Sequence, residues 1–369
     1  MNFVIIKSGF KESLAVVEKG TGDSQNLPIL KNVLVEAENN SCSLTTTNLE
    51  IAVRYTVPCK VIEPGKLTVP LQTLHTLVGT LENERISVET KQNVFRLVSD
   101  NYEAKLQGMP ADDFPIIPKI KNAAESIEIK SDILKDALRK VMIATQFSDL
   151  RPELNSVLFD FSIDVIKCVA TDGFRLAEKS IGSGQFSTTI KEPFRILVPL
   201  RTVQELIRIL KDGETVHIFR DENQILFKTE MLEFISRLVD GNFPDYSAII
   251  PKKFDSEVII AKTEFVQALR LMSVFGNKNN EVKLTAKDNK GIEVAAAAES
   301  LGENKYVLSA KIKGTPEPII FNWRYLLDVL KIIDTETVFF GLNDDQKASL
   351  LKSPGEGSYF YILKPILKA

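Results

Sequence analysis

The chain has 369 residues, a formal net charge of −3 and ordinary apolar and charged fractions, which indicate a globular protein of two or three domains. No apolar run approaches the roughly 18 residues that a membrane span requires, and the N-terminus lacks the features of a secretory signal, so we expect a cytoplasmic protein. Cys42, Cys59 and Cys168 are far apart and form no CxxC pair, so we expect small buried side chains there, not a disulfide framework or a zinc site.

The first third of the chain predicts two helices and several strands. Residues 8–19, SGFKESLAVVEK, have a helical pattern, and a proline-containing loop leads into an apolar strand at 27–37. Residues 69–90, VPLQTLHTLVGTLENERISVET, predict an extended lead-in, an amphipathic helix, an acidic turn and an alternating strand. Residues 112–120 close this segment with Phe-Pro and a later Ile-Pro-Lys.

The same order of elements returns in the middle of the chain. A helix is predicted at 131–142, a proline loop and strand at 151–161, and a second copy of the lead-in, helix, turn and strand at 198–219. The helix inside that copy has apolar residues at i, i+3, i+4 and i+7 from Val203, which is one stripe on a helix of 3.6 residues per turn. Residues 241–254 repeat the closing Phe-Pro and Ile-Pro-Lys.

A third copy completes the pattern, with helices predicted at 262–273 and inside 321–342. Alternating segments joined by short turns favour an α+β fold in which two helices pack on one face of antiparallel sheets in each repeat. The sequence therefore predicts three similar domains, at residues 1–121, 126–251 and 255–369.

The residues assemble no catalytic, cofactor or metal motif. His75 and His217 have no second histidine or cysteine nearby, and neither HExxH nor GxxxxGK[ST] is present. GTGDS at 20–24 is not a complete GxGxxG, and the paired carboxylates of the chain occur at turns and segment ends, where turn chemistry explains them. We therefore expect a non-enzyme without catalytic residues, cofactor or bound metal.

Cations recur at matched positions of the repeated helices. Arg201 and Arg208 correspond to Arg324 and Lys331, and each pair is seven residues apart, which places both members on one helix face. The same alignment adds further basic residues to the set, which are Lys11, Lys135, Arg139, Lys140, Lys211 and Arg270.

Two interpretations of these cations stay open. Charges on a helix usually form a solvated face, and the first repeat has Gln72 and Gly79 where the second has Arg201 and Arg208. Recurrence at matched positions instead favours one shared surface that contacts DNA phosphates without reading sequence.

The chain resembles the DNA polymerase III beta subunit family of bacterial sliding clamps along essentially its full length. The motifs that carry the resemblance are LPILKNVLVEA (27–37), TNLEIAV (47–53), VPLQTL (69–74), RPELNSVLF (151–159), ATDGFRLA (170–177), VDGNFPDYSAIIP (239–251) and the terminal YILKPIL (361–367).

The resemblance implies a DNA clamp fold with three domains per chain and a head-to-tail homodimer that closes into a ring around double-stranded DNA. An edge strand near 102–109 is expected to pair with one near 304–311 of a second copy. Leu106, Val274 and Phe275 match apolar interface positions, although each could instead be part of the core of its own domain.

The resemblance also implies a peptide-binding pocket that receives short linear motifs of the replicative polymerase, the clamp loader and repair proteins. Phe174 stands where the family commonly has His, and Lys364 stands where it commonly has Met, so motif preference is expected to differ here. The implied pocket residues are Leu154, Thr171, Gly173, Phe174, Arg175, Leu176, Pro244, Ile249, Ser349, Lys364, Pro365, Ile366 and Leu367.

Two other functions compete with a processivity clamp. A repeat-built scaffold could bind peptides without encircling DNA, and an enzyme could have a site spread across domain boundaries. The matched basic positions favour the clamp over the scaffold, and the lack of a nucleophile, metal or phosphate motif opposes the enzyme.

Overall fold

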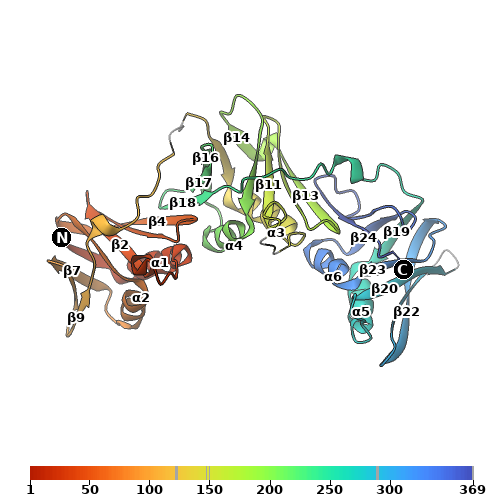
Figure 1. The fold of residues 1–369 in the computed structure, drawn as a ribbon, viewed down its shortest axis with the longest axis horizontal. Helices are drawn as coiled ribbons and strands as arrows, with labels where there is room; N and C mark the ends of the chain where they lie inside the picture. The colour runs from red at the N-terminus through yellow and green to blue at the C-terminus, as the bar shows by residue number, and fades with distance from the viewer. Residues whose placement is uncertain (121–123, 147, 149, 288–290, 368–369) are drawn as a thin grey trace. The chain divides into compact units, whose positions relative to one another are not determined.

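The computed structural model describes residues 1–120, 124–146, 148, 150–287 and 291–367. Figure 1 shows the chain as a ribbon with its helices and strands labelled. The chain forms two compact units, which are described separately. Unit 1 comprises Met1–Asp132, Phe186–Lys191 and Gln204–Leu238, and unit 2 comprises Ile133–Gln185, Glu192–Val203 and Val239–Ala369. Residues 121 and 369, at which two of the expected domains end, lie outside the described residues.

Unit 1 is built on two antiparallel sheets. One sheet has, in spatial order, β5 (Lys60–Glu63), β1 (Asn2–Ile6), β7 (Arg85–Lys91), β8 (Val94–Ser99) and β9 (Tyr102–Gln107). The other has β14 (Phe186–Thr188), β10 (Ile127–Lys130), β16 (Thr215–Arg220), β17 (Gln224–Lys228), β18 (Leu232–Arg237), β4 (Ile51–Pro58), β3 (Ser41–Thr47), β2 (Asn32–Glu38) and β6 (Gly65–Pro70).

The second of these sheets joins distant parts of the sequence, because β4 pairs with β18 in a register that runs from Tyr55 opposite Leu232 to Ile51 opposite Ser236. Helix α1 (Lys7–Val17) contacts β3, β4 and helix α2 (Leu71–Thr80). Its stripe of Phe10, Leu14 and Val17 is completely buried, as expected for an amphipathic helix.

Helix α1 is shorter than the predicted helix 8–19, because the chain tightens into a 3₁₀ turn at Glu18–Gly20. A side chain at Gly20 would lie 2.6 Å from Thr46 Oγ1 and 2.8 Å from a Val53 methyl carbon. Gly20 in the GTGDS segment therefore serves close packing against the sheet. The other 3₁₀ turns in the described residues are Pro28–Lys31, Ala111–Asp113, Ser183–Gln185 and Ser247–Ile249.

Unit 2 contains one long antiparallel sheet. Its spatial order is β15 (Phe194–Pro199), β11 (Ser156–Phe161), β12 (Val165–Thr171), β13 (Arg175–Gly182), β26 (Tyr359–Leu363), β25 (Ser349–Lys352), β24 (Thr337–Leu342), β19 (Ser256–Ala261), β22 (Gly302–Gly314), β21 (Gly291–Ala298), β20 (Glu281–Lys287) and β23 (Ile319–Asn322). β13 pairs with β12 on one side and with β26 on the other, so the C-terminal strand lies beside the β12–β13 hairpin.

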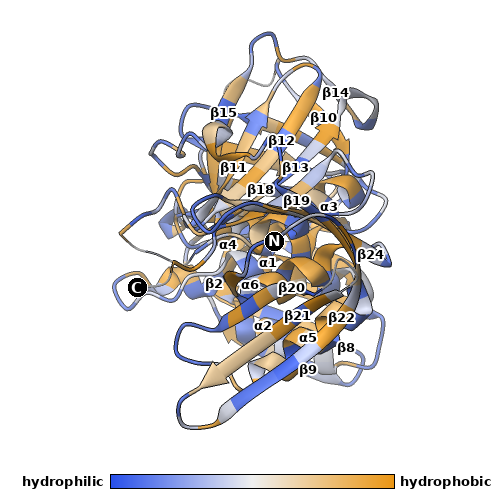
Figure 2. Cartoon of the chain, turned by 90° about the vertical axis from the view of Figure 1, so that its right-hand side faces the viewer, coloured by the Kyte–Doolittle hydropathy of each residue, from blue (hydrophilic) through white to orange (hydrophobic). Residues whose placement is uncertain are grey.

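Helices α5 (Lys262–Ser273) and α6 (Trp323–Ile332) contact one another in unit 2, and α5 also contacts β19, β21 and β22. Figure 2 shows largely hydrophobic colouring in the region of α5 and β20–β21, in line with the complete burial of Phe265 and Val294. The side chain of Asn322 accepts a hydrogen bond from the backbone N–H of Arg324 and so caps the N-terminus of α6.

The threefold order of elements is confirmed. Strand, helix and strand follow one another as β6–α2–β7, as β15–α4–β16 with α4 at Leu200–Ile209, and as β23–α6–β24. Helices α3 (Ser131–Met142) and α5 have the predicted bounds. Every strand pair among the described residues is antiparallel, as the sequence predicted.

Candidate functional site

A tight turn between β12 and β13 presents one aromatic side chain to solvent. Thr171 Oγ1 accepts a hydrogen bond from Gly173 N at 3.1 Å, and Asp172 Oδ1 accepts from Phe174 N and Arg175 N, both at 2.9 Å. Gly173 has a φ of +89°, a backbone conformation that glycine adopts without steric cost. The result is a fixed turn from which Phe174 projects with 62% of its surface exposed.

Arg175 points the other way and is held by two carboxylates. Its Nε lies 2.9 Å from Asp172 Oδ2, and its Nη1 lies 2.8 Å from Asp328 Oδ2 on α6. The guanidinium also lies 4.1 Å from the ring centre of Tyr325, a cation–π distance. Only 11% of the Arg175 side chain is exposed, so this cluster fixes the turn to α6.

The C-terminal segment lies beside the same turn. Leu363 on β26 is paired with Arg175 on one side and with Ser349 on the other. Beyond the strand, Lys364 N donates to Phe174 O at 2.9 Å, and Ile366 N donates to Ile320 O at 2.8 Å. The structure thereby brings together the turn, Ser349 and the tail through Leu367, which is 57% exposed.

An apolar cluster lies beneath this region. Leu176 is completely buried and packs with Tyr246 and Ile362. The segment around Pro244, which is exposed, reaches the cluster through the partly buried Phe243, and Ile249 N donates to Tyr246 O at 3.1 Å. The remaining members of the cluster core are Leu158, Val169 and Leu197.

The predicted pocket residues thus differ in how accessible they are to a ligand. Leu154, Leu176 and Ser349 are buried and can shape a surface but not touch a ligand, whereas Phe174 and Leu367 are open to one. Sequence reasoning missed Asp172, Tyr246, Tyr325 and Asp328. The first two lie inside the quoted motifs, but no local signal connects α6 to the turn.

Most of the predicted basic residues are exposed on or next to helices. In unit 1, Lys11 and Arg208 are exposed, and Arg208 has an ion pair with Glu205 at 3.0 Å. In unit 2, Lys331 lies 3.7 Å from Asp328. The other exposed members of that unit are Arg139, Arg201, Arg270 and Arg324.

Three lysines of the predicted set behave differently. Lys135 was expected to face DNA, but it is buried, with 7% of its surface exposed, and has an interaction within the chain. Lys140 is 14% exposed between Asp136 and Asp334.

The third is Lys211, which is engaged within unit 1. It forms an ion pair with Glu12 of α1, and its Nζ donates to Tyr55 Oη at 3.1 Å. Tyr55 Oη in turn donates to Glu12 Oε1 at 3.0 Å. The hydrogen bond from Lys211 lowers the pKa of the Glu12 carboxyl against the opposing effect of its partial burial.

Each unit has an open strand edge at the place where the expected pairing between copies falls. In unit 1, β9 is the last strand of its sheet, and it carries the half-buried Leu106. In unit 2, β22 pairs with β21 over residues 302–309, but with β19 only over 310–314, so its first half has one unpaired side within the described residues.

An apolar surface accompanies the open half of β22. Leu271 and Val274 at the end of α5 are 45% and 65% exposed, and Val307 on β22 is 57% exposed. Asn304 Nδ2 donates to Leu271 O at 2.8 Å and so connects strand and helix. Val274 is open to a partner, whereas Phe275 is half-buried.

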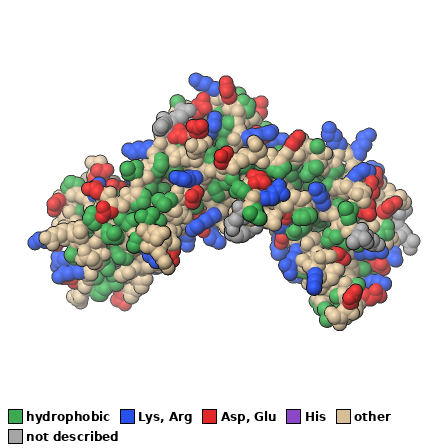
Figure 3. Space-filling view, in the orientation of Figure 1, with side chains coloured by type: hydrophobic (Ala, Val, Ile, Leu, Met, Phe, Trp, Pro, Cys, Tyr) green, Lys and Arg blue, Asp and Glu red, His purple; other side chains and the backbone are tan. Residues whose placement is uncertain are grey.

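Charges of both signs are mixed on the face of the molecule that Figure 3 shows. Figure 3 shows basic and acidic side chains interspersed on the visible face of both units, in keeping with the net charge of −3. Within the described residues, no group of three or more His, Cys, Asp or Glu side chains could hold a metal ion. None of the helices there is long and apolar enough to cross a membrane.

Comparison with known proteins gives similarity along the whole chain. Models of the DNA polymerase III beta subunit match residues 1–118 for the N-terminal domain, 128–245 for the central domain and 247–366 for the C-terminal domain. The beta sliding clamps of Bacillus subtilis and Synechococcus elongatus are each 27% identical, with 99% of both chains covered.

Solved structures agree with the sequence matches. The DNA polymerase sliding clamp of Bacillus subtilis superimposes with a TM-score of 0.94 at 27% identity, covering 100% of both chains. A sliding clamp of Pseudomonas aeruginosa bound to griselimycin has the same TM-score, identity and coverage.

Proposed function

This chain belongs to the DNA polymerase III beta subunit family and is a DNA sliding clamp with the three-domain clamp fold, and we propose that two copies join head to tail in a ring around duplex DNA. It is a non-catalytic subunit of the polymerase holoenzyme. The observation that carries this conclusion is the end-to-end match of three successive domain models to one chain. We place the domains at residues 1–121, 126–251 and 255–369.

The proposed ring closes by pairing β9 of one copy with the open half of β22 of the other. Unpaired strand edges of this kind are templates for strand addition. The exposed Val274 and Val307 support this choice, because an apolar surface next to an open edge is what a stable interface buries. Leu106 on β9 is the proposed counterpart, and Phe275 would line the contact from within unit 2.

The proposed contact with DNA uses the exposed cations of the helices. Arg201, Arg208, Arg324 and Lys331 can approach phosphates, which are the same at every step of the duplex and therefore permit movement along it. Lys135 is buried and does not belong to this proposed surface.

The proposed docking site for partner proteins is the region of the β12–β13 turn and the C-terminal tail. Phe174, Ile249 and Leu367 offer exposed apolar contacts beside the buried Arg175 cluster. A short linear motif with apolar anchors suits such a surface, and we propose that the polymerase, clamp loader and repair proteins dock there. The protein would act in the cytoplasm, where a bacterial chromosome is replicated.

Primer extension on primed circular single-stranded DNA tests the function. We expect the chain to convert short products into full-length ones when its replicative polymerase, its clamp loader and an excess of competitor DNA are present. Product lengths that do not change when the chain is added would contradict a clamp. A scaffold that does not encircle DNA would bind the polymerase peptide without lengthening the products.

A further inference from the structure

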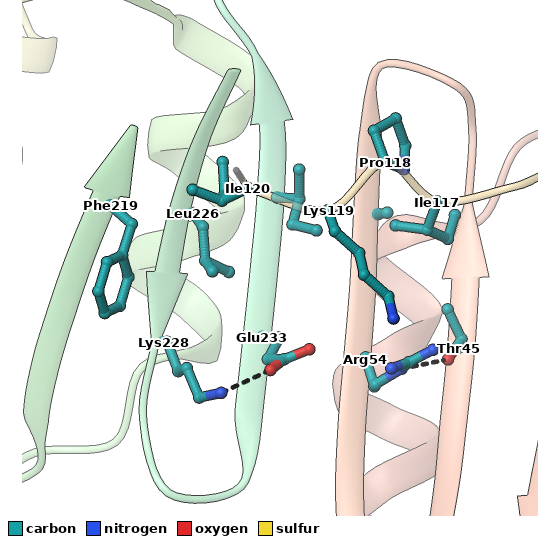
Figure 4. A pocket seen from close by; sticks show the side chains of 12 residues that line it. Thr45, Arg54, Ile117, Pro118, Lys119, Ile120, Phe219, Leu226, Lys228 and Glu233 are labelled. Carbon is teal, nitrogen blue, oxygen red and sulfur yellow. Dashed lines mark hydrogen bonds and ion pairs between the residues drawn. The ribbon is translucent and has the colours of Figure 1, made fainter. Parts of the chain in front are cut away.

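A cavity of about 360 Å³ lies in unit 1, where β4 pairs with β18 and residues 117–120 cross the sheet (Figure 4). Adjacent side chains of a strand point to opposite faces, so Arg54 of the cavity faces away from α1, which Tyr55 contacts through Glu12. The cavity therefore lies on the sheet face opposite α1.

The wall of this cavity is mostly apolar. Seven of its twelve lining residues have apolar side chains. Figure 4 shows Phe219, Leu226 and Ile120 gathered toward one end, while Lys119 extends from the crossing segment toward Arg54. A volume of this size lies at the lower end of the range for small-molecule sites, which are mainly apolar with a few fixed polar groups.

Positive charge is in excess among the residues that line the cavity, of which Lys119 is exposed to solvent. Lys228 Nζ is paired with Glu233 Oε1 at 2.8 Å, which balances the only acidic residue in the lining. Arg54 donates from Nε to Thr45 Oγ1 at 3.2 Å and lies 3.5 Å from Glu36, whose charge offsets its own.

The remaining donors are Arg54 Nη1 and Lys119 Nζ. Neither has a hydrogen-bond or ion-pair partner among the described residues. Arg54 is held in place by its other contacts, so its free donor is pre-oriented, and one cationic charge is left without a counterion. This combination fits one negative charge at one end of an apolar body.

We propose that this cavity binds a small amphipathic carboxylate, with the carboxylate between Arg54 and Lys119 and the apolar chain against Leu226 and Phe219. The single excess charge matches a monoanion. A bound ligand would contact both the sheet and the crossing segment, so it would hold residues 117–120 against the β4–β18 junction.

Calorimetric titration of the full chain with sodium octanoate, octan-1-ol and sodium acetate tests this proposal. Octanoate should bind about tenfold or more tightly than octan-1-ol, because hydrogen bonds to a charged group are the stronger ones, and acetate should give no measurable binding. Equal affinities for octanoate and octan-1-ol, or no binding of octanoate, would overturn the proposal.

Matched variants locate the site. Lys119→Met keeps the aliphatic stem but removes the charge, so octanoate affinity should fall about tenfold while octan-1-ol affinity stays the same. Leu226→Ser should weaken both ligands, and Lys91→Met, an exposed lysine on β7 outside the cavity, should change neither. Unchanged octanoate affinity in Lys119→Met would contradict the assignment.

Hydrogen exchange gives a readout that does not depend on a variant. Octanoate should slow exchange of the amides of Lys119 and Ile120 in the unmodified chain, because the ligand holds this segment against the sheet. Protection confined to residues 171–176 in unit 2 would place the ligand at the peptide-docking region and overturn the proposal.

Discussion

The turn between β12 and β13 places two neighbouring residues, Phe174 and Arg175, in opposite environments. The turn exposes the phenyl ring of Phe174 and buries the guanidinium of Arg175 between Asp172 and Asp328. The ATDGFRLA motif predicted a turn here, since Asp-Gly favours a hairpin. The partner Asp328 could not be predicted, because it lies 153 residues away and only the folded chain brings it near.

Replacing Arg175 by methionine should destabilise unit 2 strongly. The change leaves the Asp172 carboxylate, which is 6% exposed, without its counterion, and removing one partner of a buried pair typically costs about 3–5 kcal/mol. The midpoint of urea unfolding should therefore fall well below that of the unmodified chain.

Arg195→Met is the matched control for this change. Arg195 pairs with Asp160 in the same unit, but its side chain is 70% exposed, and such surface pairs contribute about 0–1 kcal/mol. Equal shifts of the midpoint in both variants would show that the Arg175 cluster has no special structural role.

Phe174→Ala should weaken partner docking without affecting stability. The ring is 62% exposed, so its removal leaves no cavity in the core, while truncation of an aromatic anchor commonly costs about 2 kcal/mol of binding. Fluorescence anisotropy with a labelled peptide that carries the polymerase's short linear motif should show the loss, and thermal unfolding should remain unchanged. Full peptide affinity in the variant would place the docking site elsewhere.

Helices and strands were predicted better than which strands pair with each other. The periodicity of the sequence gave the helix bounds at 131–142 and 262–273, because an apolar stripe at i, i+3 and i+4 is a local property. The pairing of β4 with β18 and of β13 with β26 depends on strands far apart in the chain, and no local pattern encodes which edges meet. The burial of Lys135 was missed because a helical pattern shows the face but not the depth of a long side chain.

Helix α1, strand β4 and the segment after α4 are connected by Glu12, Tyr55 and Lys211, and this connection should be sensitive to acid. The folded-state pKa of Glu12 lies below the ordinary value of 4.5, so its contribution is full above that pH and is lost as pH falls through the lowered pKa.

Glu12→Gln tests this contribution. We expect a lower thermal midpoint than the unmodified chain at pH 7 and a shallower decline of the midpoint below pH 4.5. Glu82→Gln, at an exposed position between α2 and β7, should follow the unmodified curve. If the thermal midpoints of all three proteins fell in parallel below pH 4.5, the Glu12 cluster would not contribute to stability.

The open half of β22 and the end of α5 should form an interface between copies. Val274→Glu places a charge where 65% of the residue is exposed, so the fold should tolerate it while an apolar contact would not. Sedimentation should give a mass near 41.3 kDa for this variant and twice that for the unmodified chain. Ile163→Glu, at another exposed apolar position, should remain a dimer. A dimeric Val274→Glu would contradict the proposed interface.

For the molecule as a whole, a net charge of −3 argues against strong nonspecific attraction to DNA. A protein with this composition can stay on DNA through enclosure, and we propose that its exposed helix cations add contacts that are individually weak and independent of sequence. The matched positions of the repeats favoured a shared surface that contacts DNA phosphates, and the family resemblance implied the ring, which a single chain does not contain.

The most direct test of enclosure loads the dimer onto nicked circular DNA with its clamp loader and then cuts the circle with a restriction enzyme. Gel filtration should show the protein retained on uncut circles and released after cutting, and blocking the DNA ends with bulky proteins should restore retention. Equal retention on open linear and circular DNA would contradict a topological link and favour direct binding.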